Sequence, residues 1–282
     1  MLPLDDATLL GLLKEDAPYG DLTTRSLGFG ASGAKLTMRA RGPMTVCGSE
    51  EAARVFALLG ARAEIAAPSG TPVAAGTLLA EATGPAEALF LGWKVAQTLT
   101  EWASGVASAT AALVDAARAV TPGIGIACTR KAVPGTRALS LKAVVAGGAE
   151  IHRTGLSDTV LLFPEHRAFG GPDALGAQIA RLRAACPERR VVVEVKTLTE
   201  AEAAAEAGAH VLQLEKFTPE EAEAAARALA GWTGCLAAAG GITAANAAAY
   251  AATGMQVLVT SSPYYAKPAD VSVAIAPARD LA

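Results

Sequence analysis

The sequence contains few of the residues from which metal sites, disulfide frameworks and nucleic-acid surfaces are built. Among its 282 residues there are four cysteines and three histidines, and no two cysteines form a CxxC pair. This usage argues against a zinc site or a disulfide framework, and we expect reduced thiols in a cytoplasmic protein. The formal net charge is −3 and only 18% of the residues are charged. We therefore expect no nucleic-acid partner.

Charge is lacking altogether between Ala228 and Ala266, which raises the question of a membrane segment. A spanning helix needs about 20 predominantly apolar residues. This stretch is mostly made of small residues and is interrupted by Gly240, Gly241 and Pro263. We expect it to form strands, a glycine loop and a helix, without membrane insertion. The sequence also lacks a dinucleotide-binding glycine fingerprint and an arrangement typical of a Ser–His or Cys–His nucleophile.

The first part of the chain has the pattern of a small α+β domain. A helix is expected from about Asp6 to Glu15, and Ser49 is expected to cap a second helix. Strand-like segments before residue 84 indicate a small antiparallel sheet. The spacing of apolar residues then predicts helix from Pro85 to about Val120, with an interruption near Ser104 and Gly105.

The second part alternates apolar, strand-like runs with alanine-rich helices. Parallel strands need such crossover helices, and the short repeat favours an incomplete (β/α) barrel of six or seven parallel strands. The six clear runs are Ile124–Cys128, Thr159–Phe163, Val191–Val195, Val211–Leu214, Cys235–Ala239 and Val257–Thr260. The helices between them are expected at Ala138–Ala146, Pro172–Ala185, Glu200–Ala207, Pro219–Leu229 and Ala244–Ala252. We expect an N-terminal domain of residues 1–108, joined by 267–282, and a barrel domain of residues 109–266.

Positive charge is concentrated between Thr129 and Asp158. This stretch contains five permanent cations and His152 against a single acid, Glu150, before Asp158. The cations are Arg130, Lys131, Arg137, Lys142 and Arg153. Such a cluster in an apolar frame favours a site for a multiply anionic small molecule. A solvated basic surface is the alternative, but the prolines and glycines that interrupt the run are not typical of a simple helix face.

Barrel enzymes carry their active residues at the carboxyl ends of the strands. Glu194 and Glu215 end two neighbouring strands, where they could share Mg²⁺ or form ion pairs with the cations. Gly240 and Gly241 precede a helix, an arrangement that favours phosphate binding at exposed backbone N–H groups. Lys196 raises the alternative of Schiff-base chemistry, and His152 and His166 are candidates for proton transfer.

The same residues resemble the quinolinate phosphoribosyltransferase (nicotinate-nucleotide pyrophosphorylase) family over almost the whole chain. The similar segments are EDAPYGDLTT (15–24), SGVASAT (104–110), TRKAVPGTRALSLKAVVAGG (129–148), HRTGLSD (152–158), EVK (194–196) and AGGI (239–242). The resemblance implies an incomplete barrel and a homodimer whose subunits share the active site. It also implies the transfer of a phosphoribosyl group from phosphoribosyl pyrophosphate, with Mg²⁺, to a ring nitrogen.

The resemblance assigns roles to individual residues. Lys131, Glu194 and Glu215 would be catalytic, with the two glutamates as metal ligands. The acceptor would contact Lys94, which arrives from the partner subunit, and Thr129, Arg130, His152, Arg153 and Phe163. The phosphoribosyl group would contact Lys131, Lys142, Ala239, Gly240, Gly241 and Ser261.

Several positions depart from the quinolinate pattern. Lys94 stands where an arginine is usual, and lysine lacks the fork that binds a carboxylate through two hydrogen bonds. Phe163 replaces a lysine, which argues against a dicarboxylate acceptor. Ala237 and Ala239 replace an acid and a serine. These changes resemble the ModD branch of the family, which is encoded with molybdate transport systems.

The sequence therefore predicts a phosphoribosyltransferase acting on an anionic nitrogen heterocycle other than quinolinate, and the resemblance to the ModD branch implies a link to molybdenum utilisation. Three alternatives stay open. The chain could be an authentic quinolinate phosphoribosyltransferase of NAD biosynthesis. It could be a non-catalytic binder of molybdate or a cofactor precursor. It could also form a Schiff base at Lys196.

Overall fold

The computed structural model describes residues 4–171 and 174–278, which form two compact units. Unit 1 takes in the described residues of Met1–Ala111, Val133–Gly148 and Tyr264–Ala282. Unit 2 consists of Ala112–Ala132 and the described residues of Ala149–Pro263. The cationic stretch is therefore divided, because Arg137 and Lys142 belong to unit 1 and the other cations to unit 2. The predicted domain boundaries stay a prediction.

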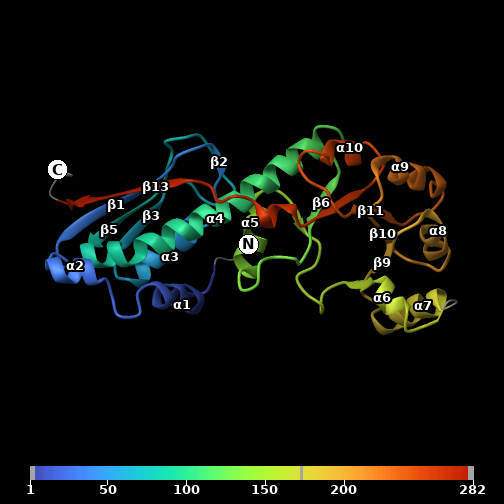
Figure 1. Ribbon diagram of the computed structural model, residues 1–282, viewed down its shortest axis with the longest axis horizontal. Helices are drawn as coiled ribbons and strands as arrows, with labels where there is room; N and C mark the ends of the chain where they lie inside the picture. The colour runs from blue at the N-terminus through green and yellow to red at the C-terminus, as the bar shows by residue number, and fades with distance from the viewer. Residues whose placement is uncertain (1–3, 172–173, 279–282) are drawn as a thin grey trace. The chain divides into compact units, whose positions relative to one another are not determined.

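Unit 1 is built on a four-stranded antiparallel sheet of order β13-β1-β5-β3 (Figure 1). Its strands are β1 (Gly33–Ala40), β3 (Arg62–Ile65), β5 (Leu78–Pro85) and β13 (Val271–Pro277), and β2 (Met44–Thr45) pairs separately with β4 (Pro72–Val73). Leu36, Met38 and Ala40 of β1 are buried at alternate positions, as expected for a strand with one face in the core. The helices are α1 (Asp6–Asp16), α2 (Leu22–Leu27), α3 (Ser49–Leu58), α4 (Ala86–Arg118) and α5 (Arg137–Ala146). The predicted α+β character of this part is confirmed.

The predicted interruption of the long helix near Ser104 and Gly105 is wrong, since α4 is continuous. Gly105 is needed for close packing: a Cβ there would lie 2.3 Å from the carbonyl oxygen of Lys267. The hydroxyl of Ser104 accepts a hydrogen bond from the backbone N–H of Cys47 at 2.9 Å. Both residues thus serve contacts of α4 and do not end it.

The predicted N-cap at Ser49 is also wrong, because Gly48 occupies the cap position with φ +94° and Ser49 is the first helical residue. A Cβ at Gly48 would lie 2.9 Å from Cδ2 of Leu99. The close packing of α4 therefore requires a glycine at the position before α3. The Ser49 side chain makes no capping hydrogen bond to the helix backbone.

Unit 2 is an incomplete barrel of seven parallel strands in the order β7-β6-β12-β11-β10-β9-β8. The strands are β6 (Gly125–Cys128), β7 (Glu150–Ile151), β8 (Val160–Leu162), β9 (Val191–Val195), β10 (Val211–Glu215), β11 (Cys235–Ala239) and β12 (Val257–Thr260). All six neighbouring pairs are parallel, which confirms the predicted fold class. The sequence showed six of these strands. It missed β7, which at two residues is too short for a period of two to be recognised.

Helices follow the strands and lie outside them, as Figure 1 shows for α8, α9 and α10. Their bounds are α6 (Pro164–Arg167), α7 (Leu175–Ala185), α8 (Leu198–Glu206), α9 (Pro219–Ala228) and α10 (Ala247–Ala251), with a 3₁₀ turn η1 at Ser262–Tyr265. Pro172, where the second of the helices predicted between the barrel strands begins, lies outside the described residues. Across residues 4–171 and 174–278, no helix combines the length and hydropathy that a membrane span requires.

Candidate functional site

The parallel strands of unit 2 bring most of the predicted site residues to one rim. In a parallel sheet all carboxyl ends point to the same edge. Around that edge lie His152 and Arg153 after β7, Thr129–Lys131 after β6, Ser261 after β12, Gly240 and Gly241 after Ala239 at the end of β11, Glu215 at the end of β10, Glu194 near the end of β9, and Phe163 after β8. We call this set the rim. Lys94 and Lys142 belong to unit 1.

Two arginines of the rim lie close together with little acid to neutralise them. Arg153 is buried, at 6% exposure. Burial lowers the pKa of its guanidinium, Arg130 lowers this pKa further, and Asp158 opposes both effects. Cζ of Arg153 lies 5.5 Å from the centroid of the Phe163 ring, a cation–π distance. This arrangement favours an anionic ligand, which would neutralise the paired cations.

The loop that carries His152 and Arg153 is fixed by hydrogen bonds. The backbone N–H of His152 donates to Cys128 O at 2.9 Å. Oδ2 of Asp158 accepts from the backbone N–H of Thr154 at 2.9 Å and from its hydroxyl at 3.2 Å. Burial lowers the pKa of His152, and Arg153 lowers it further, against the raising influence of Asp158 and Gln213. His152 is therefore mostly neutral near pH 7, and its ring then offers one N–H donor and one lone pair.

Two carboxylates of the rim lie on neighbouring strands. Burial raises the pKa of Glu194, and the charges of Glu215 and Glu165 raise it further. Nε2 of Gln213 donates to Oε2 of Glu194 at 3.0 Å. Such mutually repelling carboxylates are relieved by a divalent cation, and Mg²⁺ commonly takes one or two carboxylates plus phosphate oxygens. Among the described residues no group of three His, Cys, Asp or Glu side chains could hold a metal, so substrate oxygens would have to complete the coordination.

The glycine pair allows a close approach between strand ends. Gly240 and Gly241 have φ of +91° and +78°. A Cβ at Gly240 would lie 2.7 Å from Cγ of Lys216 and 3.1 Å from Oε1 of Glu215. Lys216 itself has φ +60°, and its N–H donates to Ala239 O at 2.7 Å. The turn therefore brings the backbone of β11 directly beside the catalytic candidate Glu215.

The expected helix does not begin directly after the glycines. Helix α10 starts at Ala247 and is five residues long. The segment before it is closed by Asn246, whose Oδ1 accepts from the N–H of Thr243 at 2.8 Å and whose Nδ2 donates to Gly241 O at 3.0 Å. The predicted phosphate site is therefore limited to the backbone N–H groups of the glycines, because the turn closed by Asn246 lies between the glycines and the helix.

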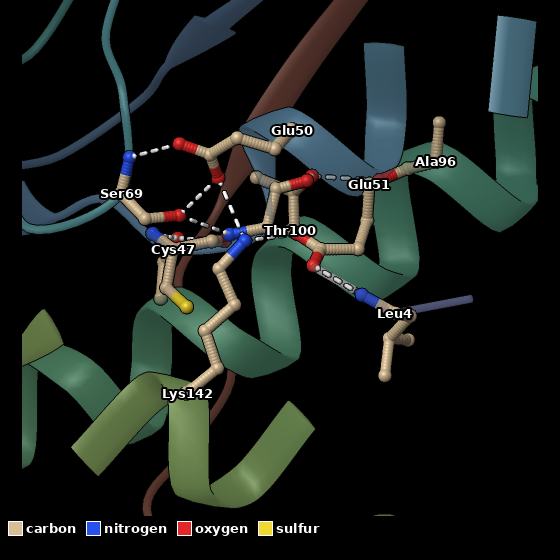
Figure 2. A network of polar contacts seen from close by, with 10 residues as sticks. Leu4, Cys47, Glu50, Glu51, Ser69, Ala96, Thr100 and Lys142 are labelled. Atoms are coloured by element: carbon tan, nitrogen blue, oxygen red, sulfur yellow. Dashed lines mark hydrogen bonds and ion pairs between the residues drawn. The ribbon is translucent and has the colours of Figure 1, made fainter. Parts of the chain in front are cut away.

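Lys142 lies in a buried polar cluster of unit 1 (Figure 2). Its Nζ is 2.8 Å from Oε2 of Glu50 and 2.5 Å from Oε2 of Glu51. Glu50 also accepts from the backbone N–H and the hydroxyl of Ser69, and Glu51 accepts from the N–H of Leu4. Its predicted phosphate contact stays a prediction; in the structure its charge is neutralised by two carboxylates.

Lys94 is exposed on α4 and also lies in unit 1. Its Nζ is 4.2 Å from the ring centroid of Trp93 and donates to Oε1 of Gln97 at 3.2 Å. Lys94 lines a cavity of about 630 Å³ together with Trp102 and Glu15. Its predicted contact with the acceptor stays a prediction.

Sequence reasoning missed two polar residues beside the rim. Asp158 closes the loop after Arg153, and Gln213 binds Glu194. Gln213 had a detectable signal, because a glutamine inside the apolar run VLQLE breaks the pattern of a buried strand. Asp158 belonged to the HRTGLSD segment but had no assigned role.

Comparison with known proteins places this geometry in a family. The family model described as "Quinolinate phosphoribosyl transferase, C-terminal domain" matches residues 106–274, and that of the N-terminal domain matches residues 21–104. The chain belongs to the quinolinate phosphoribosyltransferase family. The resemblance seen in the sequence is confirmed, and the chain is a phosphoribosyltransferase, a pentosyltransferase whose acceptor is not assigned by this membership.

Three relatives match between 74% and 98% of the chain. A Rhodobacter capsulatus protein named "Putative pyrophosphorylase ModD" is 65% identical over 88% of this chain and 96% of its own length. The human nicotinate-nucleotide pyrophosphorylase [carboxylating] is 35% identical over 74% of this chain and 69% of its own length. The crystal structure of NadC from Streptococcus pyogenes is similar with a TM-score of 0.90 at 28% identity, covering 98% of this chain and 99% of that one.

Proposed function

We propose that this phosphoribosyltransferase uses phosphoribosyl pyrophosphate and Mg²⁺ to phosphoribosylate an anionic nitrogen heterocycle other than quinolinate. The observation that carries the proposal is the rim, which combines closely spaced arginines with a pair of carboxylates on neighbouring strands. The arginines suit an anionic acceptor, and the carboxylates suit Mg²⁺ with a pyrophosphate substrate.

The acceptor is expected to carry less negative charge than quinolinate. The carboxylating enzymes among the relatives are named for a reaction of nicotinate nucleotide. In this chain Phe163 presents a ring to Arg153 where the family resemblance has a lysine. A ring supports the guanidinium but cannot pair with a second carboxylate. A heterocycle with a single anionic group therefore fits better.

The residues of the rim act mainly by positioning and electrostatics. The lone pair of an acceptor ring nitrogen forms the bond to C1 of the ribose while the C1–O bond to pyrophosphate breaks, and pyrophosphate leaves with the electron pair. Arg130 and Arg153 hold the acceptor's anion and orient its nitrogen. Lys131 contacts phosphate oxygens, where negative charge accumulates as pyrophosphate departs. The backbone of Gly240 and Gly241 approaches the 5′-phosphate.

Glu194 and Glu215 are the residues that would hold Mg²⁺. When bound, the ion would neutralise charge on the pyrophosphate oxygens. Glu194 also receives the amide hydrogen of Gln213, which fixes the orientation of its carboxylate. Both glutamates would in addition stabilise positive charge developing on the ribose.

A thermal-shift series tests the proposal. The purified chain is heated with phosphoribosyl pyrophosphate and Mg²⁺, and separately with molybdate, quinolinate and nicotinate. The donor with Mg²⁺ should raise the melting temperature, and Glu194→Gln with Glu215→Gln should abolish the shift. Absence of a shift at millimolar donor would overturn the transferase proposal. A shift with molybdate alone would favour a binding protein, with molybdenum as the link.

Turnover then separates the acceptors. Pyrophosphate release is measured with each heterocycle, and robust release with quinolinate would contradict the inference from Phe163. In Phe163→Lys the added cation should improve the use of quinolinate relative to nicotinate. Borohydride trapping should leave Lys196 unmodified, and a trapped adduct at Lys196 would favour the Schiff-base alternative.

We further propose that the chain works as a homodimer in which Lys94 of one subunit serves the rim of the other. Two observations support this. Lys94 is exposed in unit 1, and position 163 carries a phenylalanine in place of the lysine that the family resemblance leads one to expect, so the rim lacks one cation. Mixing the inactive variants Lys94→Ala and Glu194→Gln, with unfolding and refolding of the mixture, should restore up to about a quarter of the activity, since one rim in each mixed dimer is intact. No recovery in a mixed dimer would contradict a shared site.

A further inference from the structure

A lysine at the carboxyl end of β10 has an unusual backbone conformation. Lys216 directly follows the strand and has φ +60°. Among residues 4–171 and 174–278 it is the one non-glycine residue with a positive φ. In this left-handed region the Cβ of an L-residue crowds a backbone oxygen, and a lysine side chain offers no local hydrogen bond in return. Glycine would adopt the same conformation without this cost, so the presence of a lysine needs an explanation from its side chain.

The side chain of Lys216 lies against the end of the neighbouring strand. Glu215 pairs with Ala239 in the register of β10 and β11, and the N–H of Lys216 donates to Ala239 O at 2.7 Å. A Cβ at Gly240 would lie 2.7 Å from Cγ of Lys216. The aliphatic part of the lysine therefore passes over Gly240, and a glycine is needed there to leave room for it.

Hydrogen-bond donors without partners meet at this point of the rim. Within the described part of the chain, the ammonium of Lys216 has neither a hydrogen-bond partner nor an ion-pair partner. The backbone N–H groups of Gly240 and Gly241 donate to no other described group either. Free N–H groups in a glycine turn form a binding place for an anion.

The glycine turn needs a positive charge if it is to hold a phosphate. A phosphate monoester carries between one and two negative charges near pH 7, about −1.5 to −2. The next helix, α10, begins only at Ala247, so its N-terminus does not adjoin the glycines. Ala239, directly before them, has no polar side-chain atom. Lys216 is the cation that packs on this turn, and lysine is a common phosphate ligand that acts as a point charge.

We propose that Lys216 is a binding residue for the phosphoribosyl donor. Its ammonium holds the 5′-phosphate together with the N–H groups of Gly240 and Gly241. Oε1 of Glu215 lies 3.1 Å from the same Cβ position at Gly240, so the carboxylate that would hold Mg²⁺ borders the same glycine. The 5′-phosphate and the ribose of one donor molecule thus have adjacent binding groups. This inference rests on the proposed phosphoribosyl transfer.

The test separates the two phosphate groups of the donor. Dissociation constants are measured by calorimetry on the full chain for phosphoribosyl pyrophosphate with Mg²⁺, for ribose 5-phosphate, and for pyrophosphate with Mg²⁺. Lys216→Met keeps the aliphatic chain and removes the charge. Lys216→Asn also removes the charge but tolerates the left-handed conformation, so it separates charge from backbone strain. Arg181→Met, at an exposed position of α7 in the same unit, is the control for net charge.

Lys216→Met and Lys216→Asn should both bind the donor and ribose 5-phosphate about tenfold more weakly than the wild type, as expected for one hydrogen bond between charged groups. Their affinity for pyrophosphate with Mg²⁺ should be unchanged. Lys216→Arg keeps a cation and should retain most of the donor affinity, and Arg181→Met should bind all three ligands like the wild type.

Three results would overturn the inference. In the first, Lys216→Met binds the donor like the wild type. In the second, Lys216→Asn does so while Lys216→Met does not, which would assign the effect to the backbone. In the third, pyrophosphate with Mg²⁺ loses as much affinity as the donor. A wild type that binds no donor would instead contradict the proposed function.

Discussion

Two buried cations of this chain have opposite surroundings. Lys142 in unit 1 is bound to Glu50 and Glu51, and Glu51 has no exposed surface. Arg153 in unit 2 has Arg130 near it, and Asp158 is the acid that acts on it. Burial lowers the pKa of both cations. The hydrogen bonds that Lys142 donates to the two glutamates more than offset this, so its pKa is raised, whereas that of Arg153 stays lowered.

The difference indicates what each cation is for. A buried charge that is fully paired belongs to the fold, because removing its partner leaves uncompensated charge. A buried charge that lies beside a like charge is typical of a binding site, where a ligand supplies the opposite charge. We infer that Lys142 holds α5 against α3 in unit 1, and that Arg153 holds an anion at the rim.

The largest expected effect is on folding. Lys142→Met removes the cation between Glu50 and Glu51, and should lower the free energy of unfolding by about 3–5 kcal/mol. Urea unfolding followed by circular dichroism measures this. As a control, Lys142→Met with Glu50→Gln and Glu51→Gln should recover most of the loss, since no charge is left buried. If the free energy of unfolding of Lys142→Met lies within experimental error of the wild-type value, Lys142 does not stabilise the fold and the comparison fails.

The next effect is on binding. Arg153→Met should leave the free energy of unfolding unchanged or slightly higher, because it relieves the repulsion from Arg130. Its affinity for phosphoribosyl pyrophosphate with Mg²⁺ should fall about tenfold, the effect of losing one favourable charge interaction worth about 1.4 kcal/mol. Titration calorimetry gives the affinity and urea unfolding the stability. A large loss of stability with unchanged affinity would reverse the assignment of roles.

A third effect is the response to acid. Burial raises the pKa of Glu50, but hydrogen bonds from Lys142 and Ser69 more than offset this and bring it to about 2. A carboxyl whose pKa is lower in the folded state stabilises the fold above its unfolded pKa, and this stabilisation is lost as pH falls towards 2. The stability of the wild type should therefore fall more steeply between pH 4.5 and 2.5 than that of Glu50→Gln. Parallel curves would show that the Glu50 carboxylate is not stabilised in this cluster.

The smallest effect is a local titration. Arg153 contributes to the lowered pKa of His152, so the pKa of His152 should rise in Arg153→Met. Nuclear magnetic resonance of the imidazole signals measures it, and Arg181→Met, on the exposed side of α7, serves as the charge-matched control outside the rim. An unchanged or lower His152 pKa in Arg153→Met would mean that the two side chains do not interact.

The sequence was informative about the barrel and about where its chemistry lies. Parallel strands have a strong pattern, and residues at their carboxyl ends, such as Arg130, Glu194 and Gly240, follow from that pattern. What the sequence could not show is how charges pair across long separations. Lys142 and Glu50 are 92 positions apart, and no local pattern predicts that they meet. Similarly, only packing against Lys267 explains why Gly105 does not end α4.

The contrast between the two cations is tested most directly by titrating phosphoribosyl pyrophosphate with Mg²⁺ into two charge-removal variants. In one, Arg130→Met is combined with Arg153→Met; in the other, Lys142→Met is combined with Glu50→Gln and Glu51→Gln. We predict that the first loses binding by about 100-fold, as two charges of about tenfold each imply. The second should bind within about twofold of the wild type, because the charge of Lys142 is already paired with Glu50 and Glu51 and is not needed for the donor. Retained binding in the first and lost binding in the second would contradict this account.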